Sequence, residues 1–195
     1  MNWKVFLFLA LVGYGAYLHF SKNTSSFTPG ETPPNAVMQT QAHAGDIQFN
    51  GFTLTPLTDY IVEARVLSRE DYSFGTEAEL SPTDLALGWG PMSSEAVLSK
   101  IKISQSNRFY YWQVEEFPIP RREIEIHSAN THIIPANDMI KRQLETVRKG
   151  QIVKLKGQLV EAKRADGWHW RSSLSREDTG NGACEVMYVT ELYIK

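Results

Sequence analysis

The chain has 195 residues, of which 42% are hydrophobic and 22% charged, and its formal net charge is −2. This composition excludes collagen-like, coiled-coil and wholly disordered proteins. The near-neutral charge argues against a dedicated nucleic-acid binder, which usually carries a basic face. The single cysteine, Cys184, excludes an intrachain disulfide and a zinc site built from several cysteines.

An apolar stretch without charges, residues 5–20, follows the basic side chain of Lys4. As a helix it would be about 24 Å long, near the lower limit for a membrane span. We expect residues 1–20 to form an uncleaved signal anchor. The alternative is a signal peptide cleaved after Gly15, although the small residues before that position match a cleavage site only loosely.

The charges beside the apolar stretch predict its orientation. Lys4 and the terminal amine precede the stretch and Lys22 follows it, which by the positive-inside rule favours a cytoplasmic N-terminus. The sequence therefore predicts a single-pass protein of the bacterial inner membrane, with its C-terminal domain in the periplasm. Residues 21–45, rich in Ser, Thr, Pro, Asn and Gln, are expected to be a flexible linker.

Residues 46–195 are expected to form one globular domain in which strands predominate. The pair Asn50-Gly51 suits a type I′ hairpin turn. Apolar and polar residues alternate through several segments, as half-buried strands require. The expected strands are residues 47–49, 52–54, 60–66, 109–114, 124–126, 153–159, 168–170 and 186–194.

Helix signals are fewer. Ser81-Pro82-Thr83-Asp84 resembles a helix start and predicts a short helix through Leu87. A second short helix is expected from Ser93 or Ser94 to Ile101. The clearest helix runs over residues 137–149 and is ended by Gly150. These elements predict a mainly β (α+β) fold, an OB-like, partly closed antiparallel barrel with one substantial helix, in which Gly157 lets the barrel curl.

Five segments resemble a family of uncharacterised bacterial membrane-anchored proteins. They are residues 80–93, 103–110, 127–136, 166–174 and 182–185, and the similarity extends over residues 60–189. The family has no established activity. The resemblance therefore implies a bacterial source and says little about chemistry.

The histidines offer the most specific candidate chemistry. His127 and His132 flank Asn130, where a bend would bring the two imidazoles together, with Asp138, His169 or Cys184 as further ligands. Zinc needs three or four such groups at about 2.0 to 2.3 Å. The alternative is an ordered connecting loop whose side chains bond to backbone groups, and we favour this because nothing in the spacing requires convergence.

Tryptophans supply the other candidate contacts. Trp89 stands between two glycines. With Met92 it either lines the edge of a ligand site or packs into the hydrophobic core. Trp168 and Trp170 follow a basic segment, residues 139–164, which carries eight basic and two acidic residues. Aromatic and basic residues together suit single-stranded nucleic acid on an OB face. A periplasmic location would remove that substrate, and anionic lipid or an acidic partner could then meet the same surface.

We therefore expect a non-enzymatic binding or assembly module of the bacterial cell envelope, with no cofactor and no metal. Its partners would be the inner membrane, through residues 5–20, and an envelope protein. Two alternatives remain open: a metal-assisted hydrolase using His127, His132 and Asp138, and an OB-type oligonucleotide binder if the domain is cytoplasmic. The residues expected to contact a ligand or partner are Trp89, Met92, His127, Asn130, His132, Trp168 and Trp170.

Overall fold

The computed structural model describes residues 37–42, 44–178, 180 and 182–195. The expected anchor (residues 1–20) and most of the expected linker (21–45) lie outside the described residues. Val37–Gln41, at the end of that linker, forms a strand (β1) that pairs with Phe52–Asp71 (β3), so ordered pairing starts before residue 46. None of the helices in the described part of the chain has the length and apolar character that a membrane crossing requires.

The remaining elements follow in chain order. The other strands are Ile47–Phe49 (β2), Thr83–Gly88 (β4), Lys102–Ser106 (β5), Phe109–Gln113 (β6), Ser128–Pro135 (β7), Ile152–Arg164 (β8), His169–Arg171 (β9) and Glu185–Ile194 (β10). The helices are Thr76–Leu80 (α2), the 3-10 turn Gly90–Ser93 (η1), Glu95–Leu98 (α3), Arg121–Ile126 (α4) and Asp138–Thr146 (α5). The fold is mainly β with short helices.

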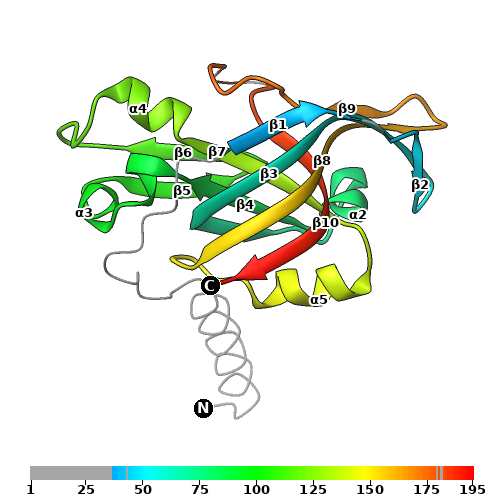
Figure 1. Cartoon of the computed structure of the whole chain (residues 1–195), viewed down its shortest axis with the longest axis horizontal. Coiled ribbons are helices and arrows are strands. Elements are labelled where there is room, and N and C mark those ends of the chain that lie inside the picture. The colour runs from blue at the N-terminus through cyan, green and yellow to red at the C-terminus, as the bar shows by residue number, and fades with distance from the viewer. Residues whose placement is uncertain (1–36, 43, 179, 181) are drawn as a thin grey trace, which may run out of the picture.

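Among the described strands, five form a closed ring in the order β3, β4, β7, β10 and β8 (Figure 1). The ring closes because β3, which is 20 residues long, pairs with β4 towards its C-terminal end and with β8 along most of its length. Strand β9 extends the sheet beyond β8, β1 and β2 pair with β3, and β5 and β6 form a separate hairpin. The sheet is mixed, because β7 and β10 are parallel. The sequence predicted an antiparallel barrel, and the parallel pairing of β7 with β10 shows that this prediction is wrong for these two strands.

The main core lies inside the ring. Every second residue of the ring strands points inwards, as in Tyr60, Val62 and Ala64 of β3 and Met187 and Val189 of β10. Helix α5 adds apolar side chains to this core through Ile140, Leu144 and Val147. Two further apolar clusters include residues of β2, β9, α4 and the β5–β6 hairpin, so additional layers cover parts of the ring.

Several local predictions are confirmed. Asn50 and Gly51 have positive φ values of 48° and 82°, as a type I′ turn requires, and join β2 to β3. Asn137 caps α5, because its side-chain oxygen accepts hydrogen bonds of 3.0 Å from the backbone N–H groups of Met139 and Ile140. A helix, α3, begins after Ser94 as expected, but it ends at Leu98 instead of Ile101 and the Ser94 side chain makes no capping hydrogen bond.

Gly157 is required where β8 meets β10. A Cβ atom at this position would lie 1.8 Å from the carbonyl oxygen of Tyr188. The irregularity in this strand pair falls between Val189 and Glu191 of β10. The expected bend is therefore present, but the extra residue belongs to the strand facing Gly157.

Two local predictions are wrong. Residues 83–87, expected within a helix, belong to β4, because pairing with both β3 and β7 buries the entire strand and overrides the capping signal at Ser81. Residues 124–126, expected as a strand, end α4. That helix follows Pro120, and an ion pair from Arg121 to Glu125 stabilises it at i,i+4 spacing.

Candidate functional site

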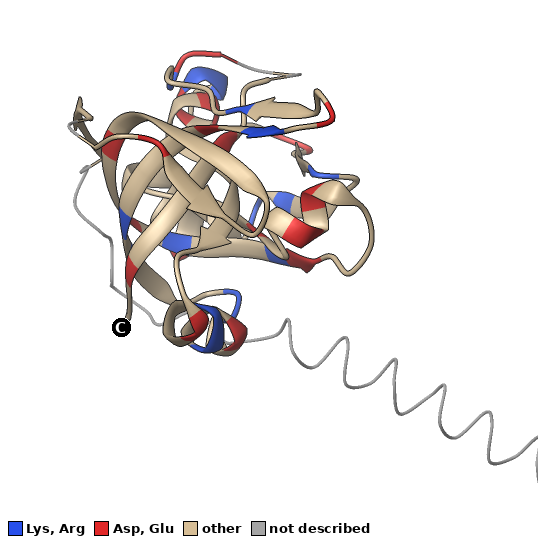
Figure 2. Cartoon of the chain, turned by 90° about the vertical axis from the view of Figure 1, so that its right-hand side faces the viewer, with Lys and Arg blue, Asp and Glu red and all other residues tan. Residues whose placement is uncertain are grey.

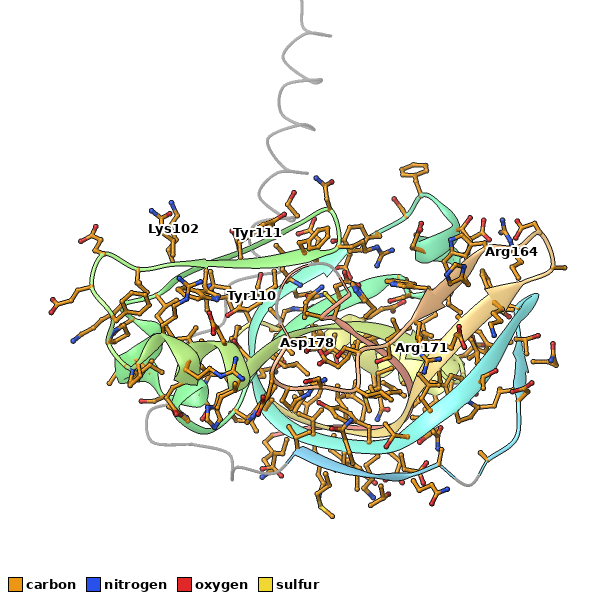
Figure 3. All side chains as sticks on the ribbon, turned by 90° about the horizontal axis from the view of Figure 1, so that it is seen from above. Lys102, Tyr110, Tyr111, Arg164, Arg171 and Asp178 are labelled. Atoms are coloured by element: carbon orange, nitrogen blue, oxygen red, sulfur yellow. The ribbon has the colours of Figure 1, made fainter. Side chains whose placement is uncertain are left out.

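A pocket of about 150 Å³ opens between three parts of the fold. Its walls come from β6, from the end of α4 with the start of β7, and from the segment that joins β9 to β10. The apolar walls include Phe109, Tyr110 and Trp112. In Figure 3, Tyr110 lies on the side of its hairpin that faces the segment carrying Asp178, whereas Tyr111 lies on the opposite side.

Two groups of opposite charge line this pocket. The Glu185 carboxylate, at the start of β10, forms an ion pair with the guanidinium of Arg176, and their side chains are 1% and 18% exposed. Oε2 of Glu185 and Nε and Nη2 of Arg176 have no hydrogen-bond partner among the described residues. Burial of Glu185 raises its pKa to about 7, although Arg176 acts in the opposite direction. Buried polar atoms without partners are uncommon and are candidate ligand contacts.

Other polar side chains fix the walls of the pocket. The Tyr110 hydroxyl donates to the Ser128 hydroxyl at 3.2 Å, and Ser128 donates to the Ile124 carbonyl oxygen at 2.6 Å. Ser173 donates to the Asp178 carboxylate at 2.5 Å. Each bond joins two different elements or orders the turn that carries Asp178, so together these bonds hold the walls of the pocket in place.

A second charged network lies beside the pocket, under the β5–β6 hairpin. Arg108, at the turn of the hairpin, donates to Asp84 Oδ1 at 2.8 Å and to the Ser81 carbonyl oxygen at 2.9 Å. His132 Nδ1 lies 2.9 Å from the same Asp84 oxygen. The Arg108 carbonyl accepts a 2.9 Å hydrogen bond from Asn130. These contacts hold the hairpin against β4 and β7.

The predicted contact residues divide into three groups. Asn130 lines the pocket. His132 and Trp170 lie beside it, with ring centroids 4.4 Å apart, and Trp168 contacts Trp170 edge-on at 6.2 Å. The remaining residues lie elsewhere: Trp89 is 5% exposed in the main core, Met92 is fully buried in another apolar cluster, and His127 follows α4.

The three proposed metal ligands have different surroundings. His127 Nδ1 lies 3.1 Å from the Glu123 carboxylate, His132 lies against Asp84, and Asp138 begins α5. Within the described residues, no group of three or more His, Cys, Asp or Glu side chains is arranged to hold a metal ion. The bend that would have joined the histidines is absent, because residues 128–135 form the extended strand β7.

Cys184 lines the pocket, but its environment opposes nucleophilic catalysis. Burial, followed by the charge of Glu185, raises the pKa of its thiol to about 12. The thiolate is the reactive form of cysteine, and catalytic cysteines have lowered pKa values. The thiol therefore stays protonated at neutral pH.

Some residues of the basic segment, residues 139–164, pair with acidic neighbours. Lys156 pairs with Glu191 at 2.9 Å, and Arg164 pairs with Asp166 at 2.5 Å. Figure 2 shows both signs of charge dispersed over the fold, including α5. Trp168 packs edge-on against Phe52, with ring centroids 5.4 Å apart.

The sequence interpretation missed Arg108, Asp84, Arg176 and Glu185. Glu185 had a signal, since it alternates in phase with the inward-facing Met187 and Val189 of β10. Asp84 was interpreted as part of a helix start, which concealed its place in a buried strand. Comparisons with protein families, curated proteins and solved structures found no match for this chain.

Proposed function

We propose that this chain is a membrane-anchored binding or assembly module of the bacterial cell envelope. Residues 5–20 would hold it in the inner membrane, with the β domain in the periplasm, as the apolar stretch and its flanking lysines predict. The domain would bind its ligand without chemical conversion.

The five-stranded ring supports an OB-type barrel. Taken in chain order, its strands are β3, β4, β7, β8 and β10, with α5 between the third and the fourth. OB domains hold ligands on their second and third strands and beside the loop between the fourth and the fifth. The pocket uses the third strand, β7, and the connection from β8 to β10, which is where an OB-type barrel would hold its ligand.

The observation that carries the proposal is the pocket with its buried Glu185–Arg176 pair, which has polar atoms free for a ligand. Enzymatic alternatives have less support: the thiol of Cys184 is not activated, and His127, His132 and Asp138 are not brought together. Binding of a ligand in the pocket needs neither an activated thiol nor converging histidine and aspartate side chains.

Site-directed photo-crosslinking in the expressing bacterium tests the proposal. A photoreactive phenylalanine replaces Phe109 at the pocket in one variant of the full chain and the exposed Tyr193 in a matched control. We expect a discrete adduct from position 109 and not from position 193. Equal adducts at both positions, or none at 109, would overturn the binding assignment.

A reporter fusion tests the location separately. Alkaline phosphatase joined after Lys195 is active only outside the cytoplasm. We expect an active fusion that stays with the membrane fraction. An inactive fusion would place the domain in the cytoplasm and contradict the envelope assignment.

A further inference from the structure

The walls of the pocket are acidic overall. They contain three carboxylates, from Glu125, Asp178 and Glu185, and one guanidinium, from Arg176, which leaves a formal charge of −2 when all four are ionised. Glu125 also pairs with Arg121 and with Arg122, neither of which lines the pocket. With Glu125 and Glu185 each paired to arginine, Asp178 is the lining carboxylate that forms no ion pair among the described residues, and its negative charge favours a cationic ligand over an anionic one.

Glu185 provides an independent sign that a ligand belongs here. Its side chain is 1% exposed, it lines the pocket, and Oε2 has no hydrogen-bond partner among the described residues. A buried carboxylate oxygen without a donor is costly. A ligand that donates to Oε2 from within the pocket would remove that cost.

The aromatic side chains in the walls of the pocket also favour a positively charged ligand. Tyr110 and Trp112 share one face of β6 and line the pocket, whereas the ring of Phe109, which is also among the lining residues, lies beside Tyr111. Aromatic faces attract ammonium and guanidinium groups at about 0.5 to 2 kcal/mol per contact. Ile126 and Ala129 add apolar surface for an alkyl chain.

We infer that the pocket receives an alkylammonium group, with its nitrogen at the Glu185 and Asp178 carboxylates and its alkyl chain against the aromatic residues. The group would come from a lysine side chain of an envelope protein or from a small free amine. This inference rests on the proposed binding function. Arg176 also has free nitrogens, but an anion seated there would lie beside Glu185 and within the same acidic walls.

Titration of the full-length protein in detergent micelles tests the inference. The probes are n-butylammonium, butyrate and n-butanol, which share an alkyl chain and differ in charge. The readout is the indole N–H resonance of Trp112, identified by its loss in Trp112→Phe. We expect n-butylammonium to shift this resonance in a saturable way, and butyrate and n-butanol to leave it in place.

Two variants connect binding to the carboxylates. We expect Glu185→Gln to weaken n-butylammonium binding by about 10- to 100-fold, because a charge-assisted hydrogen bond is lost. Asp178→Asn, at an exposed position, should weaken it in the same direction and serves if Glu185→Gln does not fold. The matched control is Glu145→Gln on the exposed side of α5, which should bind as the unmodified chain does.

The source of the amine is distinguished by two further probes. Tighter binding of Nα-acetyl-lysine methylamide than of n-butylammonium indicates a protein side chain, and equal binding of ethanolamine indicates a small amine. Saturable binding of butyrate, equal binding of n-butanol, or no binding of any probe would overturn the inference. If the position-109 adduct persists in that case, the proposed function stands and only the ligand class is wrong.

Discussion

Asp84 and His132 face each other across β4 and β7, and 2.9 Å separates the carboxylate Oδ1 from the imidazole Nδ1. Asp84 is fully buried, and Arg108 reaches the same oxygen from the turn of the β5–β6 hairpin. The buried carboxylate thus connects two strands of the ring to an inserted hairpin. Because β6 forms a wall of the pocket, this network also positions the candidate site.

Removing Arg108 should destabilise the protein strongly. We expect Arg108→Ala to lower the free energy of unfolding by about 3 kcal/mol, because it leaves the Asp84 carboxylate buried with fewer partners. Urea denaturation measures the change. Arg121→Ala is the control, since Arg121 is 69% exposed and its i,i+4 pair contributes about 0.5 kcal/mol or less. Equal effects of the two variants would contradict the role given to the buried network.

Glu185 should make stability depend on pH. Its pKa is about 7 in the folded protein and 4.5 is its ordinary value, so the folded state binds more protons than the unfolded state between these limits. Its contribution to stability therefore decreases as pH rises from about 4.5 to about 7. Glu185→Gln should flatten this part of the curve, measured by denaturation at a series of pH values.

The control for this titration is Glu145→Gln, at an exposed position on α5. The control should keep the decrease in stability seen for the unmodified chain. A Glu185→Gln curve that parallels the unmodified one would show that another group is responsible.

Gly157 should tolerate no side chain. In Gly157→Ala the new Cβ would meet the Tyr188 carbonyl oxygen at 1.8 Å, so β8 and β10 must separate. We expect a loss of about 3 kcal/mol in thermal or urea denaturation. Gly45→Ala is the control, since a Cβ there meets nothing within 4 Å, and it should change stability by about 0.5 kcal/mol or less. A stable Gly157→Ala variant would mean that the strands are less closely paired.

Cys184 should be unreactive in the folded protein. Burial raises the pKa of its thiol to about 12, so the thiolate is scarce at pH 8. We expect slow alkylation by iodoacetamide, followed by mass spectrometry, and rapid alkylation once urea unfolds the chain. Rapid modification of the folded protein would reopen the case for a catalytic cysteine.

The fold was partly predictable from local patterns. Alternation revealed parts of β3 and most of β8, because each of these strands has one face on a core and one face towards water, whereas β6 was predicted from its aromatic residues. The alternation pattern did not identify β4, because this strand is buried throughout and so shows no alternation of apolar and polar residues. It also failed at α4, where the alternating residues 123–126 belong to a six-residue helix.

The candidate site was harder to predict than the fold. Of the predicted contact residues, Asn130 lines the pocket, while Trp89 and Met92 lie in apolar clusters. The pocket joins β6, β7 and the β9–β10 connection, which are tens of residues apart in the chain. No spacing rule relates Arg176 to Tyr110 or Asp178 to Glu125, because their proximity depends on how the strands pair.

The sequence by itself determined the mainly β composition, the hairpin at Asn50-Gly51 and the capped helix after Asn137, since each follows from local periodicity or turn chemistry. Only the tertiary structure decided that β7 and β10 are parallel, that β3 and β8 close the ring, and which charges are buried together. The reason is physical: local signals act over a few residues, whereas strand pairing and desolvation of Glu185 and Asp84 depend on groups distant in the chain.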